Sequence, residues 1–271
     1  MIILLYIFIG ILGTIIGSFI NVLVSRGHAG ESLMGRSHCM SCHKTIPVIY
    51  LIPIIGYFLS GCKCFSCHTK ISPRYVIGEL LLGIVYMVTF SGIMSYGVTL
   101  SMLGIIFIVG VYVCVTLLFY VSYYDSMYRL VPVFPLIGVV ILATVFQLVT
   151  GVGSWIGGLW GICIGLPFVL LWVISHGSSF GFGDIEIIIV MGYVIGMLYG
   201  FWYALGAVFG AFWLGTLVIG GYVVYRLIRG DSYMSIRKTH FPFAPFLLVV
   251  FWIVIMFRVS IIFSLYTLFM K

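Results

Sequence analysis

The sequence predicts an all-α polytopic membrane protein with about eight transmembrane helices and a small cytoplasmic loop domain that resembles a zinc knuckle. Of its 271 residues, 63% are hydrophobic and only 7% are charged, whereas a soluble domain carries about 25% charged residues. Mean hydropathy is +1.29. Apolar runs of about 20 residues, enough to cross a bilayer, recur along the chain. Together these observations exclude an ordinary soluble enzyme.

Eight apolar runs are candidate spans. The first lacks the basic start of a signal peptide and ends at Arg26, so we expect a retained helix. The resulting organisation is a first transmembrane helix (1–24), a cytoplasmic cysteine-rich loop domain (25–75) and a membrane domain (76–271). The expected spans are 2–24, 76–95, 99–122, 131–150, 153–175, 184–200, 201–226 and 242–268.

Basic residues predict the orientation of these spans. The net charge is +7, and Lys and Arg gather in loops 25–75 and 226–240 and at Arg129. The positive-inside rule places these loops in the cytoplasm and both termini outside. The same charges favour contact with anionic membrane lipid, and nothing in the sequence resembles a nucleic-acid-binding module. On this topology Asp125 and the Gly181-Phe182-Gly183-Asp184 turn fall on the same, cytoplasmic side.

Four cysteines in loop 25–75 predict a metal site. Cys39-x-x-Cys42 and Cys64-x-x-Cys67 are separated by 21 residues, a spacing typical of a four-thiolate structural zinc site. A loop of about 50 residues is also too small to fold around a hydrophobic core alone, so it needs a stabilising site of this kind. Reduced thiols or a redox pair are the alternative. Other side chains offer competing ligands, namely Cys62, His38, His43 and His68.

Two of the six acidic residues are candidate catalytic groups. Asp125 and Asp184 border apolar segments, where a carboxylate is costly and a functional role is the default. The plain alternatives are a pair between Asp125 and Arg129, and a favourable helix-start charge for Asp184. Two nearby carboxylates tend to share one proton, so one can activate water while the other protonates a carbonyl. Gly181 and Gly183 would support the second acid by admitting an extended peptide.

The order of short motifs along the chain resembles that of a known family. Its motifs run in order from Gly17-Ser18-Phe19-Ile20-Asn21 through the cysteine pairs, Ile71-Ser72-Pro73-Arg74, Glu79-Leu80, Asp125, Gly181-x-Gly183-Asp184 and Pro242-Phe243-Ala244-Pro245. This order is similar to that of the bacterial type IV prepilin peptidases. These are bifunctional leader peptidases and N-methyltransferases of pilus, type II secretion and competence systems.

The resemblance implies that Asp125 and Asp184 are catalytic. It implies cleavage of prepilin-like and pseudopilin precursors at the cytoplasmic face of the bacterial inner membrane. The leader would be short and basic, end in Gly and precede an apolar helix. Loop 25–75 would then be the methyltransferase region and 76–271 the aspartyl peptidase domain.

S-adenosylmethionine is the methyl donor that the resemblance implies. No glycine-rich nucleotide motif is present, and Glu79 and Gly83 are candidate participants. Their plain alternative is helix packing, with Glu79 paired to Arg74. Glu186 departs from the family, since it stands where many relatives carry Lys.

Other functions stay open from the sequence. One is peptidase activity without methyl transfer. A second is a proton-coupled transporter, which would need acids near the bilayer midplane, whereas Asp125 and Asp184 lie at helix ends. A third is a zinc-loop scaffold without chemistry, which leaves the Gly-x-Gly-Asp turn unexplained. The sequence does not define the oligomeric state.

Overall fold

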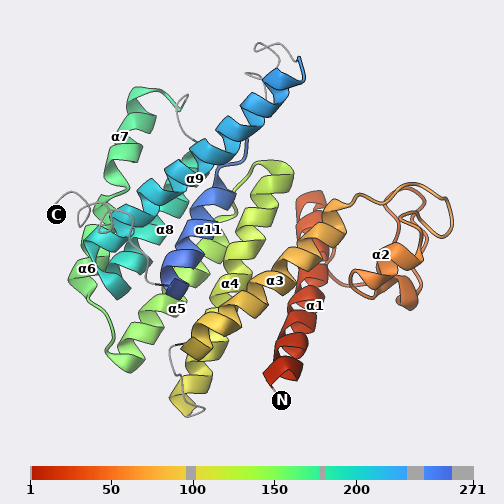
Figure 1. Cartoon of the computed structure of the whole chain (residues 1–271), viewed down its shortest axis with the longest axis horizontal. Helices are drawn as coiled ribbons and strands as arrows, with labels where there is room; N and C mark the ends of the chain where they lie inside the picture. Colours follow the sequence, from red (N-terminus) through yellow and green to blue (C-terminus); the bar gives the residue numbers. More distant parts are fainter. Residues whose placement is uncertain (1, 96–101, 178–180, 231–240, 258–271) are drawn as a thin grey trace. The chain divides into compact units, whose positions relative to one another are not determined.

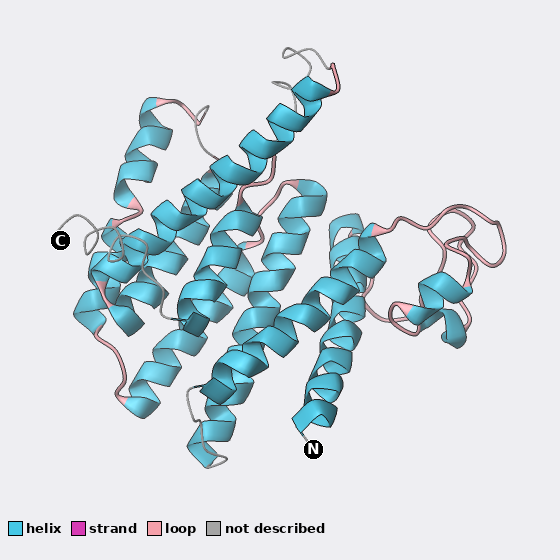
Figure 2. Cartoon of the chain, in the orientation of Figure 1, coloured by secondary structure: helices cyan, strands magenta, loops and turns pink. Residues whose placement is uncertain are grey.

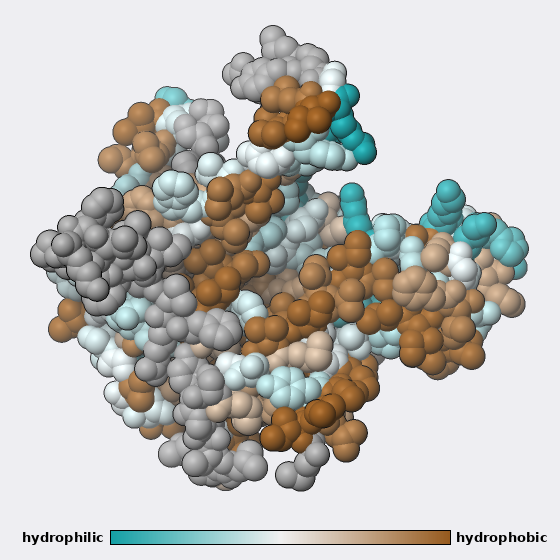
Figure 3. Space-filling view, in the orientation of Figure 1, coloured by the Kyte–Doolittle hydropathy of each residue, from teal (hydrophilic) through white to brown (hydrophobic). Residues whose placement is uncertain are grey.

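The computed structural model describes residues 2–95, 102–177, 181–230 and 241–257. These residues form helices joined by loops, with no β-strand among them (Figures 1 and 2). Seven helical segments are apolar and long enough to cross a membrane. Exposed apolar side chains cover much of the helical surface shown in Figure 3. The predicted all-α polytopic membrane fold is therefore confirmed.

The expected spans correspond to observed helices. The seven apolar segments are α1 (Ile2–Ala29), α3 (Arg74–Ser95), α4 (Met102–Tyr128), α5 (Val133–Thr150), α6 (Trp155–Cys163) with α7 (Leu166–Ile174), α8 (Phe182–Tyr199) and α9 (Phe201–Ile228). The expected eighth span, 242–268, begins as α11 (Ala244–Phe257), and positions 258–268 lie outside the described residues. So do residues 96–101, which include the break between the expected spans 76–95 and 99–122.

One expected helix is divided. The predicted span 153–175 is two helices, because α6 ends at Cys163 and α7 begins at Leu166. Pro167 lies in the first turn of α7, where a missing N–H costs nothing. Within a continuous helix the proline ring would meet the carbonyl four residues earlier. The proline therefore explains the interruption.

The chain divides into two compact units, residues 1–108 and 109–271. This division by contacts does not test the functional boundaries predicted at residues 24 and 75. In the first unit, α1 packs on α3 through small residues. A Cβ added to Gly13 would lie 2.9 Å from the Gly83 Cα, and one added to Gly17 would lie 2.9 Å from the Glu79 Cα. The loop between these helices carries a 3-10 turn, η1 (Val48–Leu51), and the short helix α2 (Ile55–Leu59).

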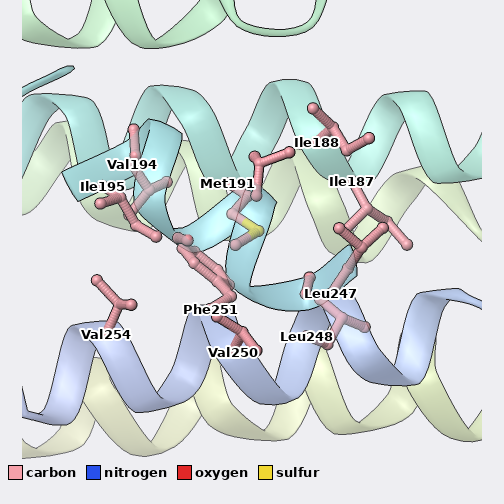
Figure 4. Close-up of a cluster of buried hydrophobic side chains, with 14 of the residues drawn as sticks. Ile187, Ile188, Met191, Val194, Ile195, Leu247, Leu248, Val250, Phe251 and Val254 are labelled. Atoms are coloured by element: carbon pink, nitrogen blue, oxygen red, sulfur yellow. The ribbon is translucent and has the colours of Figure 1, made fainter. Parts of the chain in front are cut away.

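Helix α8 is the centre of the second unit. Its buried residues lie on every side of the helix, including Ile185, Ile187, Ile188, Met191 and Ile195. A helix that is apolar all round is one that neighbours enclose. Figure 4 shows α8 side chains meeting those of α11, with Met191 and Ile195 near Phe251. Because Asp184 lies in the first turn of α8, this core positions it.

Glycines let α6 and α8 approach closely. A Cβ added to Gly161 would overlap the Gly192 carbonyl oxygen, and one added to Gly157 would overlap that of Gly196. The two helices therefore touch backbone to backbone, as small residues spaced four apart permit in membranes.

Gly161→Leu is expected to separate α6 from α8. Overpacking of this kind costs about 3 kcal/mol, so we expect the midpoint of thermal unfolding in detergent to fall by about 5 °C or more. Gly220→Leu in α9 is the matched control, because no neighbouring atom lies within 4 Å of a Cβ built there. Equal midpoints for the two variants would contradict the close contact.

Candidate active site and metal site

Asp125 lies in the last turn of α4. Its side chain is only 6% exposed, and its Oδ2 is buried without a hydrogen-bond partner. The helix ends where Arg129 takes a left-handed conformation, φ 57°, with its N–H still bonded to the Asp125 carbonyl at 2.8 Å. Arg129 acts on Asp125 electrostatically, but the described residues show no ion pair between them. The simple pair considered from the sequence is therefore not what holds Asp125.

Asp184 lies in the first turn of α8. Gly181 precedes the helix in an extended conformation (φ −68°, ψ 135°), and its carbonyl accepts the Asp184 N–H at 3.2 Å. The positive end of the helix dipole favours a carboxylate here. Glu186 stands two positions further on, and side chains so spaced on a helix do not face each other.

The start of α8 passes close to the loop that follows α4 in the second unit. A Cβ added to Gly183 would lie 2.6 Å from Cγ2 of Val131, which follows α4. Only glycine therefore fits where the start of α8 passes the loop after α4. Asp125 and Asp184 lie close enough to interact electrostatically. Two neighbouring carboxylates tend to share one proton, so one can act as a base and the other as an acid.

The start of α11 also contacts this pair. The Ala244 backbone N–H donates a hydrogen bond to the Asp125 carboxylate, and Ala244 is fully buried. Pro242 and Pro245 on either side have no N–H of their own. The amino-acid sequence does not predict this contact, because a backbone donor has no side-chain signature. The only available clue was a helix start between prolines, where the first N–H groups lack intrahelical partners.

The two cysteine pairs form matching turns. Each has the sequence C-x-S-C-H. The His43 N–H bonds to the Cys39 carbonyl at 2.9 Å, and the His68 N–H bonds to the Cys64 carbonyl at 3.0 Å. The serine N–H in each turn points to the first sulfur at 3.4 Å. The repeated pentapeptide thus builds the same turn twice.

These turns bring four sulfurs together. The Sγ atoms of Cys39, Cys42, Cys64 and Cys67 all lie within 4.8 Å of one another. The Cys39–Cys67 separation is 3.8 Å, and Cys42–Cys64 is 4.0 Å. A tetrahedral zinc with Zn–S bonds of about 2.3 Å needs sulfurs roughly 3.8 Å apart. The cluster therefore has the geometry to bind one zinc ion.

The competing ligands lie outside this group of four. Cys62 takes a left-handed conformation (φ 60°) and hydrogen-bonds with Tyr57. His38 stacks on His43 with ring centroids 5.8 Å apart. The hydroxyl of Thr69, 3.2 Å from the Cys67 sulfur, lowers the pKa of the Cys67 thiol to about 6. Such a thiol readily supplies the thiolate that binds a metal.

The candidate cofactor residues Glu79 and Gly83 lie in different surroundings. The Glu79 Oε2 accepts the Ile54 N–H at 2.7 Å. Glu79 lines a cavity of about 400 Å³ in the first unit. Gly83 is not among the residues that line it, and a Cβ there would lie 2.8 Å from the Thr14 methyl. Gly83 therefore serves the packing of α1 on α3.

The family model and the relatives that match this chain point to the same family. Residues 11–93 match the family model described as Bacterial Peptidase A24 N-terminal domain. The prepilin leader peptidase/N-methyltransferase of Bacillus subtilis (strain 168) is 30% identical over 208 residues, covering 74% of this chain and 80% of the relative. The protein of the same description from Pseudomonas aeruginosa is 25% identical over 283 residues, covering 91% and 88%. No solved structure matches.

Proposed function

The chain belongs to the prepilin leader peptidase/N-methyltransferase family, and on that premise we propose that it is a membrane aspartic endopeptidase that cleaves prepilin-like and pseudopilin precursors and methylates the new N-terminus. The observation that supports the peptidase proposal is that Asp125, in the last turn of α4, and Asp184, in the first turn of α8, lie close enough to interact electrostatically. Its apolar helices make the chain a multi-pass membrane protein.

In the proposed cleavage, the aspartates divide the work of acid and base. The ionised carboxylate takes a proton from water, and the water oxygen attacks the scissile carbonyl carbon. The protonated carboxylate donates its proton to the carbonyl oxygen. Collapse then breaks the C–N bond: the leaving amine takes the proton that the first carboxylate drew from water, and the hydroxyl of the intermediate returns its proton to the second carboxylate as the new carboxylic acid forms. The Ala244 N–H bonded to Asp125 would hold that carboxylate in place, and no covalent enzyme intermediate forms.

The substrate's shape supports a site at helix ends. A precursor of this class has a polar leader followed by an apolar helix, so the scissile bond lies where the membrane meets water. Asp125 lies in the last turn of its helix and Asp184 in the first turn of its own. Basic residues in the loops on that side favour a cytoplasmic site in the bacterial inner membrane.

Methyl transfer is the second proposed activity. When bound, S-adenosylmethionine supplies a sulfonium methyl whose carbon bonds to the new α-amine nitrogen, while the C–S electron pair stays on sulfur and a proton leaves the amine. The chain's own contribution is to bind the donor and to orient the amine. The four-cysteine cluster would hold zinc structurally, since four thiolates leave no open coordination position.

Cleavage of a prepilin-like substrate by the purified protein in detergent tests this function. Intact-mass measurement should show loss of the leader, and with S-adenosylmethionine a further gain of one methyl group. Cleavage without that gain would leave a peptidase only. If well-folded protein cuts no such substrate, the peptidase proposal fails and a proton-coupled transporter becomes the better explanation.

Gly183→Ala is expected to slow cleavage at least tenfold. Its methyl group would overlap Val131 and push the first turn of α8, with Asp184, away from α4. Small displacements of a catalytic group have effects of this size. Gly220→Ala in α9 is the matched control, because no neighbouring atom lies within 4 Å of a Cβ built there. An equal loss in both variants would argue against the Val131 contact as the cause.

A further inference from the structure

A cavity of about 400 Å³ lies in the first unit, between the cysteine loop and the helices α1 and α3. Small-molecule sites typically measure about 300–1,000 Å³. Residues from both helices and from the loop line it, including Asn21, Arg26, Tyr50, Phe65, Tyr75 and Glu79. The aspartates of the second unit are not among its lining residues. The proposed cleavage chemistry therefore makes no use of it.

Asn21 gives the cavity a buried acceptor without a partner. Its side chain is only 5% exposed, and its Nδ2 donates to the Tyr75 carbonyl at 3.1 Å. Its Oδ1 is buried with no hydrogen-bond partner. A buried acceptor without a partner lowers the stability of the fold. A ligand that donates a hydrogen bond to this oxygen would remove that cost.

Glu79 gives the cavity a carboxylate that also shapes its wall. It is 9% exposed and accepts the Ile54 N–H. Ile54 has φ 61° and ψ −57°, and the Ile55 N–H bonds to the Pro53 carbonyl at 2.6 Å. This is a classic γ-turn, rare and strained for a β-branched residue. Glu79 lines the cavity, so the carboxylate that faces the cavity also fixes a strained turn beside it, and strain of this kind clusters at ligand sites.

The other residues that line the cavity include aromatic rings and basic side chains. The rings of Tyr50 and Phe65 lie 5.6 Å apart at 30°, an arrangement that offers an aromatic face for a base to stack on. Arg26 is 7% exposed, and its guanidinium bonds to the carbonyls of Ser32, Leu33 and Arg36. Arg26 thereby fastens the end of α1 to the loop. Lysines also line the cavity, namely Lys44, Lys63 and Lys70.

We propose that this cavity is the S-adenosylmethionine site, an assignment that rests on the proposed methyl transfer. The ligand carries an ammonium, which can donate a hydrogen bond to the Asn21 oxygen, and a sulfonium, whose positive charge suits the Glu79 carboxylate. Its adenine suits the Tyr50 and Phe65 rings, and its carboxylate suits the lysines. The zinc cluster contributes indirectly, because Cys39 and Cys64 also line the cavity.

Isothermal titration of the purified full-length protein with S-adenosylmethionine tests the site without relying on turnover. Glu79→Gln keeps an oxygen for the Ile54 N–H but removes the charge. Asn21→Leu removes the unpaired acceptor. We expect each to weaken binding about tenfold or more, the loss typical of one hydrogen bond to a charged ligand. The matched control is Gln147→Leu in α5, another buried amide with an unpaired oxygen, which should bind as wild type does.

The midpoint of thermal unfolding and the zinc content show whether each variant is folded. If Asn21→Leu does not fold, Glu79→Gln tests the site by itself. If folded Glu79→Gln binds with the wild-type Kd, and wild type methylates a pre-cleaved substrate, the cavity assignment is wrong and the proposed function stands. If wild type neither binds S-adenosylmethionine nor methylates that substrate, the proposed methyl transfer fails and the cavity assignment fails with it.

Discussion

Asp184→Asn is expected to abolish leader cleavage, and Asp125→Asn to do the same. Asparagine keeps the shape of each side chain but neither takes a proton from water nor donates an acidic one. General acid–base groups contribute about 10²–10⁴-fold, so each rate should fall by about 10³-fold or more. Cleavage of a prepilin-like substrate under single-turnover conditions measures this.

The controls separate chemistry from folding. Both variants should unfold within a few degrees of wild type, since the substitution removes no atoms from the core. Glu186→Gln removes an acid from the same helix as Asp184, on a side chain that does not face it, and we expect its rate to stay within about threefold of wild type. Full-rate cleavage by either aspartate variant would overturn the proposed dyad.

Loss of the metal is the second large effect. Cys64→Ser, or a strong chelator, is expected to remove the zinc that we propose the four cysteines hold, and to unfold the loop between α1 and α3. Structural zinc sites contribute about 10–16 kcal/mol of folding free energy, and the loop has only the short η1 and α2 to hold it otherwise. Elemental analysis should report the loss of zinc, and hydrogen exchange should report the loss of amide protection in residues 37–71.

Cys62→Ser is the matched control for this effect. Cys62 lies two residues before Cys64 but outside the cluster of four sulfurs. Its variant should keep the metal and the protected amides. Equal release of zinc from both variants would show that the four-cysteine ligand set is wrong.

Features encoded by local spacing could be predicted from the sequence. The cysteine turns follow from two short motifs, because each closes its own hydrogen bonds. The spans follow from apolar length, and the division of α6 from α7 was signalled by Pro167, although the prediction joined them.

Features that depend on distant partners could not be predicted. Nothing near Gly161 in the sequence indicates that it faces Gly192. The Glu79 contact with Ile54 joins residues 25 positions apart, too far along the chain for a local motif to indicate it. The Ala244 N–H on Asp125 belongs to the backbone, which every residue except proline shares.

The backbone contact between α6 and α8 has an evolutionary consequence. Gly192 lies eight positions after Asp184, about 12 Å along the helix. The position of Asp184 along the helix axis thus depends on the packing of α6 against α8. That packing joins backbone to backbone, so no side chain can change its rotamer to compensate for a substitution. Lineages can exchange one lipid-facing apolar residue for another at little cost, whereas Gly157, Gly161, Gly192 and Gly196 can change only with a shift of the whole helix. Selection on the reaction should therefore preserve these four positions as strictly as the first turn of α8.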